Sequence, residues 1–445
     1  MASDWDTYPI SDFVTLSQGL AINAKSKYLL EETGLPLLRI TDLINGTQVH
    51  FVNEEKAPPK CIATDHELIY TRTGQVGLVY RNKVGVVHNN CFKVIPSPEL
   101  DKDFLYWFLF QESTKAHVNA VASGSVQKDL NHAAFLTLSI PKPELSEQKA
   151  IASILDSLDD KIELNRQMNE TLEAMAQALF KSWFVDFDPV IDNALAAGNT
   201  IPDEFSERAE QRKGIEKKDD SDIQDLFPDE FEFTEEMGWI PKGWGISEVK
   251  DFGQVVCGKT PSKKKAEYYG NDISFIKIPD MHDVAWATTT TDNLSFEGSN
   301  SQKNKLIPKG SICVSCIATV GKVLITSREA HTNQQINSVI PAEKNTLYYL
   351  YSSFLAMEKN LQDLASGGAV TLNLNTSNFS KIKIILPPSL VLDAYDSAVN
   401  SLYVKNLKLL IQNQELAKIR DTLLPKLMSG ELRIPDAAAL VDEAI

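Results

Sequence analysis

The sequence predicts an α+β protein in which two similar mixed domains are separated by two long antiparallel coiled-coil helices. The first observation is an internal repeat. When the chain is displaced by 244 positions, Val76-Gly77 falls on Val320-Gly321 and Phe135 falls on Phe379. The second is a run of side chains spaced three and four residues apart at the end of each repeat, which is the pattern of a coiled-coil seam. Such a duplication predicts two like domains related by a pseudo-two-fold axis.

Residues 1–143 form the first predicted domain and residues 239–386 the second. Short apolar runs separated by Gly, Pro, Asn and Asp indicate strands joined by turns. In the first domain we expect strands at 37–40, 67–70, 76–80, 92–95 and 135–140 and a helix at 101–118. In the second we expect strands at 274–278, 311–316, 321–325, 336–340 and 381–386 and a helix near 346–364. The aromatic side chains of both helices are expected to pack a core rather than to stack on bases.

The long helices are predicted at residues 144–184 and 387–430, each after a pair of prolines. The first seam comprises Ile151, Leu155, Leu158, Ile162, Asn165, Asn169, Leu172, Ala176, Leu179 and Trp183. The second comprises Tyr395, Val399, Leu402, Asn406, Leu409, Asn413, Leu416, Arg420, Leu423 and Leu427. Roughly 40 residues at about 1.5 Å each make a rod of about 60 Å. The alternative is two surface helices that pack on separate cores.

The net charge of −16 is concentrated in one segment. Residues 185–238 carry 17 acidic and 5 basic side chains, a net −12, and are predicted to be a partly mobile connector with short helical pieces. Residues 431–445 are a C-terminal tail. The second domain carries 16 basic and 12 acidic side chains, a net +4. The acidity of the whole chain therefore does not exclude a nucleic-acid partner.

Several functional classes lack support in the sequence. No run approaches the roughly 18 uncharged apolar residues of a membrane span, so no membrane contact is expected. Five cysteines, an odd number, indicate a reducing compartment, and we expect the cytoplasm. The scattered histidines give no metal site, and Cys313 and Cys316 are expected to be packed thiols on opposite faces of a strand. No catalytic motif other than an apparent P-loop was found, which favours a binding protein without catalytic residues.

The apparent P-loop is the segment Gly253–Thr260, which satisfies G-x-x-x-x-G-K-[ST]. A functional P-loop needs a helix immediately after the glycine-rich turn, because its N-terminus faces the phosphates. Here Pro261, Ser262 and three lysines follow instead. A P-loop NTPase is therefore the enzyme alternative, and a coiled-coil scaffold for protein interaction is the structural one.

Three pairs of polar loops recur at matching places in the two domains. They are residues 71–75 and 315–319, residues 88–90 and 333–335, and residues 123–128 and 367–372. Arg, Asn and Gln side chains can read guanine and adenine edges, whereas Lys, Ser and Thr suit phosphates. The alternative for each loop alone is a turn with a solvated tip. Three pairs in one register favour readout of DNA.

Several stretches resemble the specificity (S) subunit of type I restriction–modification systems. They are residues 258–277 (GKTPSKKKAEYYGNDISFIK), 319–323 (TVGKV), 332–337 (TNQQIN), 146–152 (SEQKAIA), 179–190 (LFKSWFVDFDPV) and 239–244 (WIPKGW). The resemblance covers nearly the whole chain. One departure is the start of the second long helix, residues 390–395 (LVLDAY), which lacks the Glu-Gln-Lys of the first.

This resemblance implies two target-recognition domains that each read one half of an asymmetric bipartite site in double-stranded DNA. It implies that the helical rod sets the spacer and docks two methyltransferase (M) subunits, which carry S-adenosylmethionine. Two restriction (R) subunits, which use ATP and Mg²⁺, would complete the cleaving complex. No cofactor is expected in this chain itself. The different start of the second helix predicts that M docking differs between the two helices.

Fifteen side chains are our candidates for DNA contact. In the first domain these are Arg72, Gln75, Asn89, Asn90, Gln127 and Lys128. In the second they are Lys259, Thr260, Lys263, Lys264, Lys265, Lys322, Gln334, Gln335 and Thr371. For M docking we expect the exposed faces of the long helices, with Trp183 and Phe184 as anchors.

Overall fold

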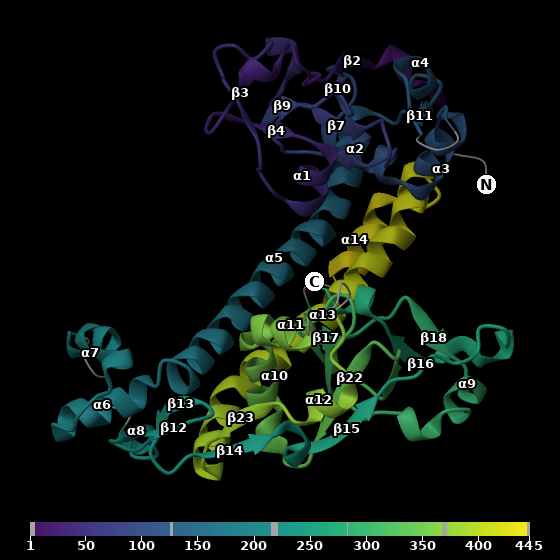
Figure 1. Cartoon of the computed structure of the whole chain (residues 1–445). Coiled ribbons are helices and arrows are strands. Elements are labelled where there is room, and N and C mark those ends of the chain that lie inside the picture. Colours follow the sequence, from purple (N-terminus) through teal and green to yellow (C-terminus); the bar gives the residue numbers. More distant parts are fainter. Residues whose placement is uncertain (1–4, 125–127, 215–220, 283, 367–371, 443–445) are drawn as a thin grey trace. The chain divides into compact units, whose positions relative to one another are not determined.

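The computed structural model describes residues 5–124, 128–214, 221–282, 284–366 and 372–442. The chain forms two compact units, which Figure 1 shows as ribbons. Unit 1 comprises residues 1–164 and 413–445, and unit 2 comprises residues 165–412. Two long helices, α5 (Leu145–Phe184) and α13 (Ser389–Ser429), each contribute one part to unit 1 and the other part to unit 2.

Unit 1 contains the first copy of the repeat. Its strands are β1 (Thr7–Pro9), β2 (Val14–Gln18), β3 (Leu30–Glu31), β4 (Leu35–Leu38), β5 (Phe51–Val52), β6 (Ile62–Ala63), β7 (Leu68–Thr71), β8 (Val79–Tyr80), β9 (Gly85–Val87), β10 (Cys91–Pro96) and β11 (Ser139–Pro141). Its shorter helices are α1 (Ile40–Asn45), α2 (Lys102–Phe110), α3 (Glu112–Val121), α4 (His132–Phe135) and α14 (Ile434–Asp442). An antiparallel sheet has the order β2-β10-β7-β8, and a second sheet has the order β3-β5-β4-β9-β6.

Unit 2 contains the second copy and the segment that joins the copies. Its strands are β12 (Phe231–Thr234), β13 (Gly238–Pro241), β14 (Gly245–Glu248), β15 (Gly253–Cys257), β16 (Tyr269–Ile276), β17 (Trp286–Ala287), β18 (Asp292–Leu294), β19 (Ile312–Ser315), β20 (Val323–Thr326), β21 (Ala330–Thr332), β22 (Ile336–Pro341) and β23 (Lys383–Leu386). Its shorter helices are α6 (Asp188–Ala197), α7 (Ser206–Lys213), α8 (Ser221–Gln224), α9 (Phe296–Asn300), α10 (Leu347–Ala356), α11 (Glu358–Ser366) and α12 (Thr376–Ser380). Its main sheet has the order β15-β22-β19-β20-β17.

The internal repeat is confirmed strand by strand. The order β2-β10-β7-β8 of unit 1 corresponds to β15-β22-β19-β20 of unit 2. Strand β19 begins and ends 244 residues after β7, and β22 begins and ends 245 residues after β10. The pair β1–β11 likewise corresponds to β14–β23, and both pairs are antiparallel. The two domains are therefore two copies of one α+β scaffold.

Several sequence predictions of local structure differ from the observed elements. The single helix expected near 346–364 is two helices, α10 and α11, separated at Met357. The single helix expected at 101–118 is two helices, because Gln111 adopts an extended backbone (φ −59°, ψ 140°) between α2 and α3. The strand expected at 135–140 is only Ser139–Pro141. Its first residues instead end α4, because the side chain of Asn131 caps that helix by accepting from the backbone N–H of Ala134.

The aromatic helices pack the cores, as expected. Trp107 of α2 is fully buried in the core of unit 1, and Phe354 of α10 is fully buried in the core of unit 2. The indole N–H of Trp107 donates to Asp156 of α5 at 2.8 Å. These rings therefore fix each sheet against the long helices and are not a surface for stacking bases.

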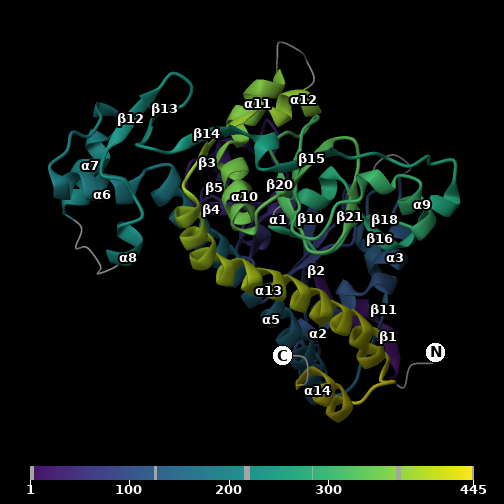
Figure 2. The ribbon, with the colours of Figure 1, turned by 90° about the horizontal axis from the view of Figure 1, so that it is seen from below.

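The two long helices lie side by side and antiparallel in each unit (Figures 1 and 2). In unit 1 the first part of α5 packs on the last part of α13, where Arg420 donates to Asp159 at 2.8 Å. In unit 2 the last part of α5 packs on the first part of α13, where Asn406 donates to Glu173 at 2.9 Å. All twenty predicted seam residues are buried or partly buried. The paired seam is thus confirmed, and the alternative of two unpaired surface helices is wrong.

Polar side chains interrupt the seam. Asn165 donates to the side chain of Gln412 at 2.9 Å, and Asn413 donates to the backbone carbonyl of Ile162 at 3.1 Å. Asn169 is 6% exposed, yet neither atom of its amide has a partner within the part of the chain that the structure describes. Asn169 and Asn413, which lie 244 positions apart and so correspond in the repeat, therefore differ in hydrogen bonding.

The acidic connector is folded onto unit 2. Phe187, Ile191 and Phe205 are buried in the core of that unit. Asp188 accepts from Arg208, and Asp192 pairs with Arg212. The sequence prediction of a partly mobile connector missed these apolar anchors because they are spread among many acidic residues. Residues 215–220 lie outside the described part of the chain.

Within the described ranges, no helix combines the length and the hydropathy that a membrane span requires.

Candidate nucleic-acid interface

The three polar loops predicted from the sequence meet in unit 1. The backbone N–H of Arg72 donates to the carbonyl of Asn90 at 2.9 Å, which joins the first loop to the second. The N–H of Leu130 donates to the carbonyl of Arg72 at 2.8 Å, and the N–H of Gly74 donates to the carbonyl of Lys128 at 2.9 Å. These two bonds join the first loop to the end of the third loop and to the residues that follow it. Backbone hydrogen bonds thus hold the three loops together at one end of the sheet.

The same bonds recur in unit 2 at the corresponding positions. Cys316 N–H donates to Gln335 O at 2.8 Å, and Leu374 N–H donates to Cys316 O at 2.8 Å. Ala318 N–H donates to Leu372 O at 3.1 Å. Backbone atoms make all these contacts, so the scaffold does not depend on which side chains the loops carry. The two units therefore present different side chains on one loop framework.

The glycine of the apparent P-loop has a structural role that both units share. A Cβ atom added to Gly258 would lie 2.1 Å from the carbonyl oxygen of Asn333, and one added to Gly19 would lie 2.3 Å from that of His88. Only glycine allows the end of β2 or β15 to approach the second polar loop of its unit this closely. A strand, β15, precedes Gly258 and no helix follows directly. The phosphate-binding geometry is absent, and the NTPase alternative loses its basis.

Arg72 is paired within unit 1. Its guanidinium makes a bidentate salt bridge with Asp129, with a shortest N–O distance of 2.7 Å, and its Nη1 donates to Gln18 at 3.1 Å. The Arg72 guanidinium holds the pKa of the Asp129 carboxyl below its usual value, against a smaller opposing effect of burial. Arg72 lies in the predicted loop cluster, but its donors are already engaged there.

The other unit 1 candidates lie in the same cluster. The Gln75 side chain is exposed, and Asn89 and Asn90 are partly exposed. Lys128 is exposed, and its ammonium donates to the carbonyl of Asn119 at 3.0 Å. Gln127 lies outside the residues that the structure describes.

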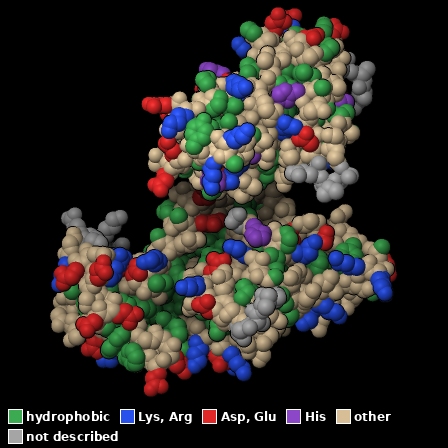
Figure 3. Space-filling view, turned by 45° about the horizontal axis from the view of Figure 1, so that its top comes forward, with side chains coloured by type: hydrophobic (Ala, Val, Ile, Leu, Met, Phe, Trp, Pro, Cys, Tyr) green, Lys and Arg blue, Asp and Glu red, His purple; other side chains and the backbone are tan. Residues whose placement is uncertain are grey.

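In unit 2 the candidates fall into two groups. Near the loop junction, Thr260 donates its hydroxyl to the Gln334 side chain, Gln335 accepts from Asn333, and Lys322 pairs with Glu358 at 3.3 Å. Thr371 lies outside the described residues. The exposed residues of the second group form a basic segment in the connection from β15 to β16: Lys259, Lys263, Lys264 and Lys265. Figure 3 shows Lys and Arg side chains gathered at the end of unit 2 that carries α9.

A buried network holds the start of this basic segment. Gln302 donates to the carbonyl of Lys259 at 3.0 Å, and Ser299 lies 2.9 Å from Nε2 of His331. Burial lowers the pKa of His331 to about 4, so its ring is neutral in the fold at neutral pH.

Sequence reasoning missed Gln18 and Asp129 as parts of the loop cluster. Both had a signal in the repeat. Gln18 directly precedes Gly19, the counterpart of Gly258, and Asp129 begins a short motif that recurs from Asn373. Neither signal revealed that the two side chains converge on Arg72, because that contact joins residues 54 and 57 positions apart.

Trp183 and Phe184, predicted to anchor partner subunits, lie in the core of unit 2. They are 7% and 6% exposed and pack on Tyr395, with ring centroids at 6.0 and 5.0 Å. Their side chains stabilise the unit itself and are not available on its surface.

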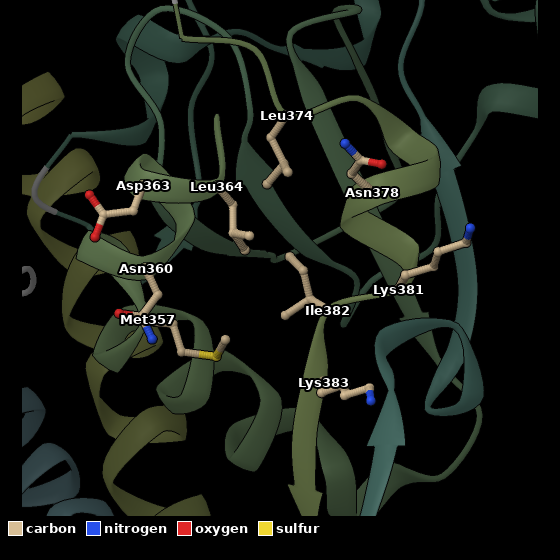
Figure 4. A pocket seen from close by; sticks show the side chains of 9 residues that line it. All are labelled: Met357, Asn360, Asp363, Leu364, Leu374, Asn378, Lys381, Ile382 and Lys383. Carbon is tan, nitrogen blue, oxygen red and sulfur yellow. The ribbon is translucent and has the colours of Figure 1, made fainter. Parts of the chain in front are cut away.

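Other features add no chemistry. Cys313 lies in β19 and Cys316 directly follows that strand. The two thiols pack in different clusters, as expected for opposite faces, and burial raises their pKa to about 12 and about 11. No cluster of His, Cys, Asp or Glu among the described residues could hold a metal ion. A cavity of about 670 Å³ in unit 2 is shown in Figure 4. It is lined by Met357, Leu364, Ile382 and other side chains of mixed polarity, and none of the candidate residues lines it.

Comparison with known proteins gives consistent matches along the chain. The family described as the type I restriction modification DNA specificity domain matches residues 2–174 and 241–391. The HindI specificity subunit of Haemophilus influenzae is 39% identical over 97% of this chain and 100% of its own length. The MjaIX specificity subunit of Methanocaldococcus jannaschii is 25% identical over 97% of this chain and 94% of its own.

A solved structure shares the fold. The S subunit of a type I restriction–modification system from M. genitalium superposes with a TM-score of 0.58 at 14% sequence identity, over 96% of each chain. The family match leaves residues 175–240 unmatched, and these include the folded acidic connector.

Proposed function

Because the chain belongs to the type I restriction–modification DNA specificity family, we propose that each of its two domains reads one half of an asymmetric, bipartite site in double-stranded DNA. The chain is a recognition subunit, and we assign it no catalytic step of its own. Recognition and the spacing of the two half-sites are its contribution to a larger complex.

The observation that carries this proposal is one loop framework with two sets of side chains. The backbone bonds at Arg72 and Cys316 correspond one to one, but the side chains around them do not. A scaffold that keeps its geometry while its loop residues change can present different hydrogen-bonding groups to different base pairs. Two domains with different loops would therefore read different half-sites.

Within this proposal the candidate side chains divide by chemistry. The amides of Gln75 and Gln334 are exposed and suit the edges of adenine. The basic segment from Lys259 to Lys265 suits phosphates, whose neutralisation adds affinity without sequence information. Most of the chain's net negative charge, −12 of −16, lies in the acidic connector, so the net charge of the whole chain does not describe the basic segment.

We further propose that the paired helices set the spacer between the half-sites. A helix of 40 residues is about 60 Å long, which corresponds to roughly 15 to 20 base pairs at about 3.4 Å each. Inserting one heptad in both helices adds about 10 Å and should lengthen the preferred spacer by about 3 base pairs. Selection from duplexes with varied spacers measures this change. An unaltered spacer preference would contradict the role of the helices as a ruler.

The partners proposed for this subunit are two M subunits, with S-adenosylmethionine, and two R subunits, with ATP and Mg²⁺. Apolar side chains are exposed on the long helices, namely Leu164 (52%), Met175 (54%), Val404 (39%) and Ile411 (42%). They replace Trp183 and Phe184 as the proposed M-docking residues. The five cysteines are free thiols, which suits our proposal that the complex works in the reducing cytoplasm.

A domain exchange tests the proposed function. Residues 1–143 are replaced by the corresponding domain of a relative, and the variant is co-expressed with its methyltransferase subunit. Selection from randomised duplexes should show one changed half-site and one unchanged half-site. A change in both half-sites, or binding that shows no sequence preference at low or high salt, would count against modular readout.

A further inference from the structure

Arg72 lies where four segments of unit 1 meet. Its Nε donates to Asp129 at 3.1 Å, and its Nη2 donates to both oxygens of the same carboxylate at 2.9 and 2.7 Å. Its Nη1 donates to the side chain of Gln18 at 3.1 Å. All three guanidinium nitrogens are therefore engaged. Arg72 would have to give up its bidentate partner before it could bind O6 and N7 of a guanine as a fork.

The partners of Arg72 extend the connection to the remaining loops. The Gln18 amide donates to the carbonyl of Asn89 at 3.0 Å, which reaches the second loop. The hydroxyl of Thr73 donates to Asp129 at 2.9 Å, which adds a further bond between the first loop and Asp129. Side chains alone thus tie the end of β2 to the first two polar loops and to Asp129, the residue that follows the third loop.

Among the residues that the structure describes, unit 2 does not repeat this charged side-chain network. Cys257, Cys316 and Asn373 occupy the positions of Gln18, Arg72 and Asp129. Among the described residues no salt bridge joins the loop at Cys316 to the loop at Asn373. The thiol of Cys316, which directly follows β19, is buried and donates to the carbonyl of Val314 in that strand. The two copies share backbone bonds, and within the described ranges a charged side-chain junction is added in unit 1 but not in unit 2.

From this difference we propose that Gln18, Arg72 and Asp129 are positioning residues for the first half-site, and that Arg72 fixes the reading loops of unit 1 instead of reading a base itself. This inference rests on the proposed function and deepens it. Ordering the loops before DNA arrives removes an entropy cost from binding, and the bond geometry of the reading side chains is then set in advance. The negative charge of the Asp129 carboxylate would repel a phosphate, so the Arg72–Asp129 pair suits a structural contact within the unit better than a contact with the DNA backbone.

Positioning and direct readout by Arg72 predict different patterns of lost specificity. A base-reading arginine controls one base pair, so its loss relaxes the preference at that position alone. A junction that orders three loops affects every position that those loops read. The two roles therefore differ in how many base positions of the half-site lose discrimination, whatever the change in overall affinity.

The experiment uses the full chain assembled with its methyltransferase subunit and a pool of randomised duplexes. Asp129→Asn keeps the shape of the side chain but removes the charge, Asp129→Glu keeps the charge, and Arg72→Lys removes the fork. Glu112→Gln is the matched control, because it removes an exposed salt bridge to Lys115 in the same unit without touching the loops. Thermal unfolding of each variant is measured in parallel.

We expect Asp129→Asn and Arg72→Lys to lower discrimination at all positions of the first half-site by roughly tenfold, about the effect of one mismatched base pair. Asp129→Glu should keep most of the wild-type discrimination at the first half-site. The second half-site, the unfolding temperature and the Glu112→Gln variant should stay as in the wild type. Unchanged discrimination in Asp129→Asn, loss at one base position only, or equal loss at both half-sites would overturn the assignment. Sequence preference of the wild-type complex at both half-sites is the separate test of the proposed function.

Discussion

Replacing Asn169 by leucine should stabilise unit 2. Asn169 lies in the seam between α5 and α13 and is 6% exposed, and both atoms of its amide lack a partner within the described part of the chain. Burying an unsatisfied amide opposes folding, because the hydrogen bonds that it makes to water in the unfolded chain are lost. A buried polar residue at a seam position is tolerated where it fixes the register of paired helices.

The expected magnitude follows from three contributions. Removing the unsatisfied amide gains about 1–3 kcal/mol. Burying a leucine side chain adds about 1.5–3 kcal/mol. The larger and differently shaped side chain costs about 1–3 kcal/mol where the seam cannot adjust. We therefore expect the free energy of unfolding to rise by about 1–3 kcal/mol. For a unit of this size, the unfolding temperature should rise by about 2–4 °C for each kcal/mol.

The assay is thermal and urea unfolding of the full chain followed by circular dichroism. Asn413→Leu is the matched control, because Asn413 donates to the backbone of Ile162 at 3.1 Å and so loses a bond on substitution. It should leave stability unchanged or lower it by about 1 kcal/mol.

Two results would refute this reasoning. A fall in the unfolding temperature of Asn169→Leu would mean that the amide is satisfied, for example by an ordered water molecule. An equal gain in Asn413→Leu would mean that hydrogen bonding in the seam does not decide its stability, and that apolar burial alone does.

Two further predictions concern unit 2. Gly258→Ala should destabilise it by about 1–3 kcal/mol through the clash of the new Cβ with the carbonyl of Asn333, whereas Gly214→Ala, with open space around it, should be neutral or slightly stabilising in the same unfolding assay. Equal effects would argue against the close approach. His331 is neutral in the fold with a pKa of about 4, below its usual 6.5, so the unfolded chain binds the extra proton between these values. Stability should therefore fall as pH is lowered from about 6.5 to about 4, and His331→Asn should remove that part of the pH dependence. A pH profile identical to the wild type would show that other groups cause it.

Much of the architecture could be predicted from the sequence because it depends on periodicity. The spacing of three and four residues identified the seam on both helices, and burial from Ile151 to Trp183 and from Tyr395 to Leu427 follows it. The displacement of 244 residues identified the two copies. Both signals are repetitive patterns along the chain, so they can be detected without knowledge of which distant residues are in contact.

The sequence also predicted three polar loops at matching places in both halves, and backbone hydrogen bonds join these places in each unit. It did not show that Arg72 would be held by Asp129 and Gln18, and residue type alone made Arg72 a reader of bases. Trp183 and Phe184 were expected on a surface for the same reason, because an aromatic pair near a helix end is compatible with docking and with a core.

The sequence by itself therefore determined the duplication, the paired helices and the placement of variable polar loops, all of which are written as patterns along the chain. Only the tertiary structure decided which of those polar side chains are free and which are already paired. The physical reason is that a hydrogen bond or salt bridge depends on the distance between atoms, and the residues concerned are more than fifty positions apart. In unit 1 such contacts join Arg72 to Gln18 and Asp129. In unit 2 the corresponding positions share the backbone bonds and add a hydrogen bond from the Cys257 thiol to the carbonyl of Gln334.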